Sequence, residues 1–105
     1  MNLQTQRNTV ELFIFARFHA QAGKEHELED AIRTVLAPTS EEAGCLSIQA
    51  FRSTRDARLF YVHARWQDED AFERHIRLPH TRLFVETVEK LIDHPLDVTR
   101  AHQFL

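Results

Sequence analysis

The chain has 105 residues, of which 43% are hydrophobic and 28% are charged, and it contains only 2 Gly and 3 Pro. This length and composition are typical of one compact folded domain and unlike those of a linker or a disordered tail. The net charge of -3, with acidic and basic residues interspersed, argues against the broad positive surface on which nucleic-acid binding depends.

The first predicted element is a strand over residues 10–20, "VELFIFARFHA", because apolar side chains occupy every second position. Its apolar face carries Val10, Leu12, Ile14, Ala16 and Phe18. Its other, mixed face carries Glu11, Phe13, Phe15, Arg17 and His19. Such a strand is typical of a sheet that helices cover on one side. We expect a second subunit to cover part of the other side.

An amphipathic helix is predicted next, between Gly23 and Pro38. Its apolar residues recur at intervals of three and four, and they are Leu28, Ala31, Ile32, Val35 and Leu36. This spacing places them on one side of a helix, which should pack against the sheet.

A hairpin follows the turn "EEAGC", with strands predicted over residues 45–53 and 58–66 and the connection "TRDA" between them. The side chains predicted to face the core are Leu46, Ile48, Ala50, Phe60, Val62, Ala64 and Trp66. The side chains that alternate with those of the second strand are Tyr61, His63 and Arg65. We assign these three to a subunit interface.

Two helices are predicted on either side of a break before Pro79. Asp68 is a good N-cap for a short helix that ends near Arg77. Pro79 fits the first turn of a second helix that ends near Ile92, and it disfavours helical geometry at the preceding Leu78. Residues 95–104 are predicted as the last strand.

The predicted fold is α+β, with the elements in the order strand, helix, strand, strand, broken helix, strand. This is the ferredoxin-like split βαβ arrangement, an antiparallel sheet with helices on one face. We assign residues 1–8 to a flexible N-terminal segment and residues 9–105 to a single domain. The lone Cys45 cannot form an internal disulfide, and no stretch has the pattern of a secretory leader or a membrane span. We therefore expect a cytoplasmic protein without membrane contact.

The segment "FERHIRLPHTRLF", residues 72–84, contains two histidines on either side of the proline. Helical spacing places His75 beside Phe72, and His80 four residues before Phe84, so both imidazoles should face the layer between helices and sheet. A metal site is not expected, since the histidines are five residues apart across a proline and no Cys or third spaced His is nearby. Hydrogen bonding to carbonyls at the helix break and acid–base catalysis both remain open.

Aromatic residues should border the same space as the two histidines. Trp66 ends its strand on the apolar face; it is either part of the core or a wall of a ligand site. We assign the walls of a substrate site to Ile14, Val62, Phe72 and Phe84. An aromatic space with few polar groups suits a flat, largely apolar ligand. Neither GxGxxG nor GxxxxGKS occurs, so no nucleotide cofactor is expected.

These segments resemble the antibiotic biosynthesis monooxygenase (ABM) family and the related quinol monooxygenases, over roughly residues 9–103. The most specific part is W-x-[DE]-x-x-A-[FL]-x-x-H-x-x-x-P-H, which runs here from Trp66 to His80, preceded by the E-x-G-C turn. The resemblance implies a dimeric α+β barrel that oxidises polycyclic phenols or quinols with O₂ and needs no flavin, haem or metal. It further implies that Trp66 positions the substrate, and that His75 and His80 act as base and hydrogen-bond donor.

Some positions depart from known branches of the family. A branch that acts on polyketides has Asn and Tyr where this chain has Val62 and Phe72, and haem-degrading relatives have a histidine in the region of Val85. We therefore expect neither that polar site nor haem. Two alternatives to oxygenation remain: an isomerase of a small carbonyl compound, and a non-catalytic ligand-binding or stress-response dimer. In each case we expect a homodimer formed through the apolar sheet face that carries Phe13, Phe15, Phe51 and Tyr61.

Overall fold

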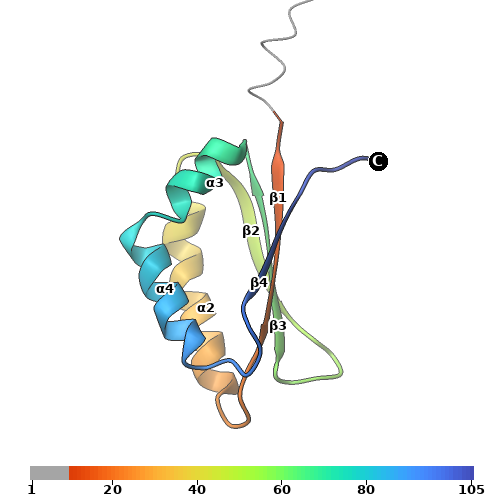
Figure 1. Ribbon diagram of the computed structural model, residues 1–105, viewed down its shortest axis with the longest axis vertical. Coiled ribbons are helices and arrows are strands. Elements are labelled where there is room, and N and C mark those ends of the chain that lie inside the picture. Colours follow the sequence, from red (N-terminus) through yellow and green to blue (C-terminus); the bar gives the residue numbers. More distant parts are fainter. Residues whose placement is uncertain (1–9) are drawn as a thin grey trace, which may run out of the picture.

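A computed structural model describes residues 10–105, which form a four-stranded antiparallel sheet with helices on one face (Figure 1). The strands are β1 (Leu12–His19), β2 (Cys45–Arg52), β3 (Leu59–Trp66) and β4 (Asp97–Ala101), in the spatial order β2-β3-β1-β4. The helices are α2 (Glu25–Ser40), α3 (Glu69–His75) and α4 (Pro79–Glu89). This confirms the predicted α+β ferredoxin-like fold. The predicted flexible segment, residues 1–8, lies outside the described residues.

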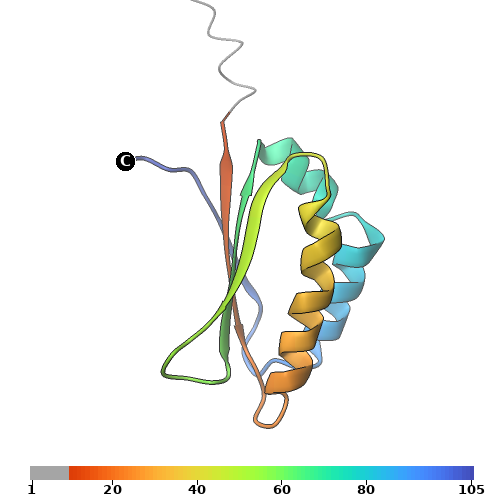
Figure 2. The ribbon, with the colours of Figure 1, turned by 180° about the vertical axis from the view of Figure 1, so that it is seen from behind.

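The central strand β1 separates the two faces of the sheet as its alternating pattern predicts. Leu12, Ile14, Ala16 and Phe18 are all buried on the helical side. Phe15 and Arg17 are exposed on the opposite face, which no helix covers (Figure 2). The hydrophobic core therefore lies entirely between the sheet and its one layer of helices.

Helix α2 continues two residues past the predicted end at Pro38. The proline lies in the last turn, and the helix ends with the N–H of Glu41 bonded to the C=O of Pro38. Leu28, Ile32, Val35 and Thr39 form its buried side. The two extra residues take the chain to the segment at 41–44 that leads into β2.

The prediction that Leu46 faces the core is wrong. The pairing of β2 with β3 shifts register between Cys45 and Ser47, so Leu46 is an extra residue in a bulge and is 49% exposed. Because of the bulge, Cys45 rather than Leu46 lies opposite Trp66 on the inner face. Beyond the bulge Ile48 lies opposite Ala64 and Ala50 lies opposite Val62. Ala50 is exposed on this edge strand, so the prediction that it is part of the core is wrong.

The break between α3 and α4 forms as the proline rule predicts, although both helices are shorter than expected. The Asp68 carboxylate caps α3 by accepting a hydrogen bond from the N–H of Ala71 at 2.8 Å. Leu78 is extended and Pro79 opens α4. The helices end at His75 and Glu89, not near residues 77 and 92. Within residues 10–105 no helix is both long and apolar enough to cross a membrane.

Candidate active site

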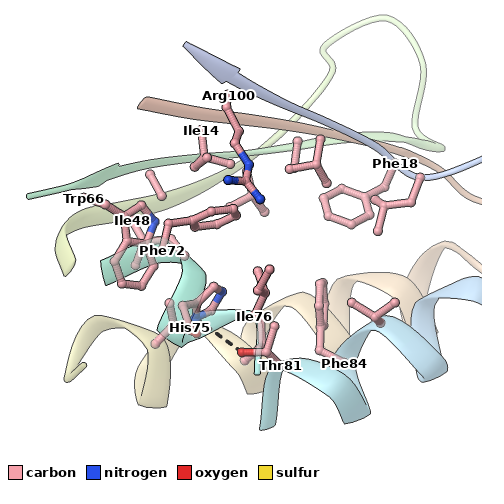
Figure 3. Close-up of a pocket in the computed structure, with 18 residues that line it drawn as sticks. Ile14, Phe18, Ile48, Trp66, Phe72, His75, Ile76, Thr81, Phe84 and Arg100 are labelled. Carbon is pink, nitrogen blue, oxygen red and sulfur yellow. Dashed lines mark hydrogen bonds between the residues drawn. The ribbon is translucent and has the colours of Figure 1, made fainter. Parts of the chain in front are cut away.

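A cavity of about 330 Å³ lies between the sheet and the helices. Six of the seven residues that the sequence assigns to a site line it: Ile14, Val62, Trp66, Phe72, His75 and Phe84 (Figure 3). The sheet provides one wall and the helices α2, α3 and α4 provide the other. Most of the lining is aliphatic or aromatic, so the space fits an apolar ligand of moderate size.

The main polar feature of this cavity is a contact between His75 and Glu42, which sequence reasoning missed. The Nδ1 atom of His75 lies 2.8 Å from Oε2 and 3.0 Å from Oε1 of Glu42. Both side chains are nearly buried, at 13% and 11% exposure. A carboxylate only accepts, so Nδ1 carries the proton, and the second ring nitrogen, Nε2, is left as an acceptor.

Burial also controls the charge of His75. Loss of solvent lowers the pKa of His75 below its usual value of 6.5, the Glu42 carboxylate opposes this shift, and a charge on His80 adds to it. The indole of Trp66 lies 4.7 Å from the imidazole between ring centroids, and the Phe72 ring lies at 5.6 Å. The site therefore holds a neutral imidazole between aromatic walls at neutral pH.

His80 does not line this cavity, which differs from the expected placement. Its Nε2–H donates to Oε2 of Glu42 at 2.6 Å, so it approaches the carboxylate together with His75. It borders a smaller groove between α2 and α4 that Ala31 and Leu83 also line. His80 therefore contacts the Glu42 carboxylate without facing the cavity. Its direct role in acid–base chemistry stays a prediction.

Three further polar groups line the cavity without having been predicted. Thr81 places its hydroxyl 3.3 Å from Nδ1 of His75, as the dashed line in Figure 3 shows. Arg100 of β4 lies 4.9 Å above the Phe72 ring and pairs with Glu69 and Glu73. Its position on the inner face follows from its pairing opposite Ile14. The hydroxyl of Thr39 completes the set.

Two of the buried polar atoms in this lining have no hydrogen-bond partner within residues 10–105. They are Nε1 of Trp66 and Oγ1 of Thr39. A buried N–H or hydroxyl without a partner is unfavourable by about 1–3 kcal/mol.

Among the described residues, 10–105, two groups of side chains have donor atoms close enough to hold a metal ion. Glu42, His75 and His80 form one, and His19, Asp93 and His94 form the other, with each set of ligand atoms within 4.8 Å. No metal was expected because the two histidines are five residues apart and no Cys or third spaced His lies nearby in the sequence, whereas Glu42 comes from a turn 33 residues before His75. That expectation stays a prediction.

Comparison with solved structures supports the fold. PA3566 from Pseudomonas aeruginosa is 28% identical, with a TM-score of 0.86 over 93% of this chain and 98% of that chain. Rv0793 from Mycobacterium tuberculosis is 22% identical, with a TM-score of 0.85 over 90% of this chain and 95% of that chain. A structure described as an antibiotic biosynthesis monooxygenase is 18% identical, with a TM-score of 0.84 over 90% and 99% of the two chains. No curated protein matches the chain.

Residues 12–87 match the family described as antibiotic biosynthesis monooxygenase. The matched span runs from β1 into α4 and includes the turn with Glu42 and the whole segment from Trp66 to His80. It therefore contains the main part of the cavity wall, although not β4 with Arg100. The chain belongs to the antibiotic biosynthesis monooxygenase (ABM) family.

Proposed function

We propose that the protein is a monooxygenase that oxidises a quinol or polycyclic phenol with O₂ inside the cavity and uses no bound cofactor. The observation that carries this proposal is the contact between Glu42 and Nδ1 of His75, which directs a neutral base toward an apolar, aromatic-walled space. An apolar site favours a flat ring and O₂ together, and the base supplies the deprotonation that makes the ring electron-rich.

The reaction follows from the electron balance of a quinol. A ring hydroxyl gives its proton to Nε2 of His75, and the resulting anion transfers one electron to O₂. The two radicals combine, forming a carbon–oxygen bond and a peroxide. The oxygen–oxygen bond then breaks as the ring carbon loses its hydrogen, and the outer oxygen leaves as water with a proton returned by His75. The quinol loses two hydrogens and gains one oxygen, and the second oxygen of O₂ is reduced to water.

The remaining polar groups fit the charge that this reaction develops. The unpartnered Nε1–H of Trp66 and hydroxyl of Thr39 are donors for a ring oxygen that becomes negative. Donors fixed in a water-poor cavity stabilise such a charge better than water does, because they need no reorganisation. We assign substrate contact to the six predicted residues that line the cavity.

Oxygen uptake tests the proposal directly. The protein, stripped of metal with a chelator, is mixed with dihydroxynaphthalenes and anthrones in an oxygen electrode. We expect uptake above the spontaneous rate, with one O₂ consumed for each product molecule. Turnover of a carbonyl compound without O₂ would instead identify an isomerase, and binding without turnover would identify a ligand-binding protein.

The pH profile of kcat/KM should have an acid limb below pH 6.5. His75 acts as a base only when unprotonated, and burial keeps its pKa under the usual 6.5. Activity therefore falls as the pH drops through that lowered pKa and is flat above it, until the substrate ionises. In Glu42→Gln the limb should move to still lower pH, because the carboxylate is the group that raises the pKa of His75. A limb above 6.5, or one that Glu42→Gln leaves in place, contradicts the assignment.

We also propose that the protein is a homodimer formed through the outer sheet face. Phe15, Phe51 and Tyr61 are 50%, 53% and 39% exposed there. The chain end with Phe104 and Leu105 extends away from the domain on this side, opposite the helices (Figures 1 and 2). Several large apolar side chains exposed on one sheet face are characteristic of subunit interfaces.

Light scattering should give a mass of twice the 12.4 kDa of one chain at micromolar concentration. Phe15→Glu places a charge at the centre of the proposed interface and should yield a folded monomer. Leu83→Glu is the matched control, since Leu83 is 64% exposed on α4 in the helical layer, and it should remain dimeric. A monomeric wild-type protein, or a dimer that persists in Phe15→Glu, contradicts this interface.

A further inference from the structure

A second cluster of ionisable side chains lies at the far end of β1 from Trp66, outside the cavity. It consists of His19 at the end of β1, Asp93 and His94 in the connection from α4 to β4, and Asp56 in the β2–β3 hairpin. We propose that His19, Asp93 and His94 bind a divalent transition metal ion of the zinc type. This site does not depend on the proposed oxygenation.

The three ligand atoms already lie within 4.8 Å of one another. Oδ1 of Asp93 lies 2.7 Å from Nδ1 of His19 and 2.7 Å from Nδ1 of His94. The two imidazole rings are 4.9 Å apart and nearly perpendicular, at 81°. Two imidazole nitrogens and one carboxylate oxygen are a donor set that Zn²⁺ accepts, with water in the fourth position. A metal bound among these three atoms would replace the two ring protons that now bridge to the carboxylate.

The backbone holds two of the ligands in place before any metal binds. The N–H of Asp93 donates to the C=O of His19 at 3.0 Å, and Ala20 forms an isolated bridge with Ile92. These contacts fix the loop against the end of β1. The side chain of His19 is 13% exposed, whereas that of His94 is 62% exposed. Because few atoms surround His94, its ring can move outward to the longer ligand spacing that a bound metal needs.

Asp56 is placed to orient His19 as metal-binding histidines are usually oriented. Its Oδ2 lies 2.9 Å from Nε2 of His19, and its Oδ1 accepts the N–H of Arg58 at 2.9 Å. A carboxylate that accepts Nε2–H leaves Nδ1 as the ligand atom and increases its basicity.

The local charge also suits a cation. Asp56 and Asp93 contribute two negative charges, and Arg58 contributes one positive charge, 3.6 Å from Oδ2 of Asp93. Arg58 thus lies beside the oxygen that the two histidines leave unused.

Calorimetric titration of tag-free, chelator-stripped protein with ZnCl₂ tests this site, and CoCl₂ reports the ligand geometry through its visible absorption. We expect one Zn²⁺ per chain at this cluster, lost in His94→Ala. Asp56→Asn should weaken binding by about 10–100-fold, because it removes only the group that orients His19. His26→Ala, in an exposed histidine of α2, is the matched control and should bind like the wild type.

His80→Ala separates this site from the group at Glu42, since it removes a ligand only there. Binding that survives His80→Ala and is lost in His94→Ala supports the proposal. Binding that survives His94→Ala, binding lost in His80→Ala alone, or no saturable binding overturns it. Circular dichroism of His94→Ala confirms the fold, which an exposed side chain should not affect.

Discussion

We expect His75→Gln to lower kcat for oxygen uptake by about 10²–10⁴-fold, the usual contribution of a positioned general base. Glutamine retains polarity and nearly the size of the imidazole, but its amide cannot take up a proton at neutral pH. The variant should keep its fold, since the cavity already lies beside His75 and the core residues are untouched. Oxygen uptake with excess substrate, corrected for the spontaneous rate, measures the loss, and thermal melting confirms folding.

The role of His75 is tested by comparing the kcat of His75→Gln with that of variants of Glu42 and His80. Glu42→Gln should also lower kcat, since the amide can present its NH₂ group to Nδ1 and no longer fixes the tautomer. The double variant should be no worse than His75→Gln alone, because the two residues act as one unit. His80→Gln should retain more activity than either, since His80 contacts Glu42 and does not line the cavity. Activity of His75→Gln within a few-fold of the wild type excludes the proposed base.

The sequence predicted the sheet and most of the cavity wall because alternation and helical spacing are local properties. Six of seven assigned site residues line one cavity for this reason. Glu42 could not be found in this way, since a glutamate in a turn is usually solvated and only the fold brings it to His75. The E-x-G-C turn was the one available signal. His80 hydrogen-bonds Glu42, and in this position it does not line the cavity.

Two other differences have local causes that periodicity does not encode. The bulge at Leu46 moves one residue out of register, and an alternating pattern contains no mark of such an insertion. Arg100 lies on the inner face of an edge strand, where a long cation reaches the carboxylates of Glu69 and Glu73 on α3. A charged residue in a strand is ordinarily read as facing solvent, so its place in the cavity lining depends on the partner helix.

The second large effect should come from Gly44→Ala, which we expect to destabilise the protein by about 2–5 kcal/mol. Gly44 has φ of +90°, and a left-handed backbone conformation is unfavourable for alanine by about 1–2 kcal/mol. A Cβ at this position would lie 2.6 Å from Cβ of Ala71, a buried residue of α3, and such overpacking typically adds about 1–3 kcal/mol. Urea unfolding measures the loss. Because Glu42 is two residues away, kcat at a temperature where the variant is folded should fall as well.

Gly23→Ala is a matched control for the part of the Gly44→Ala destabilisation that comes from the backbone conformation. Gly23 has φ of +86°, and a Cβ there meets no atom within 4 Å, so Gly23→Ala should show only the conformational penalty of about 1–2 kcal/mol. The difference between the two variants therefore measures the contact with Ala71. Ala71→Gly removes the atom that clashes, so Gly44→Ala should be less harmful in that background than in the wild type. The two alanine variants could prove equally unstable, or Ala71→Gly could leave the destabilisation by Gly44→Ala unchanged. Either result would mean that α3 shifts without cost to accept the Cβ, and that the turn at Gly44 does not fix Glu42 relative to α3.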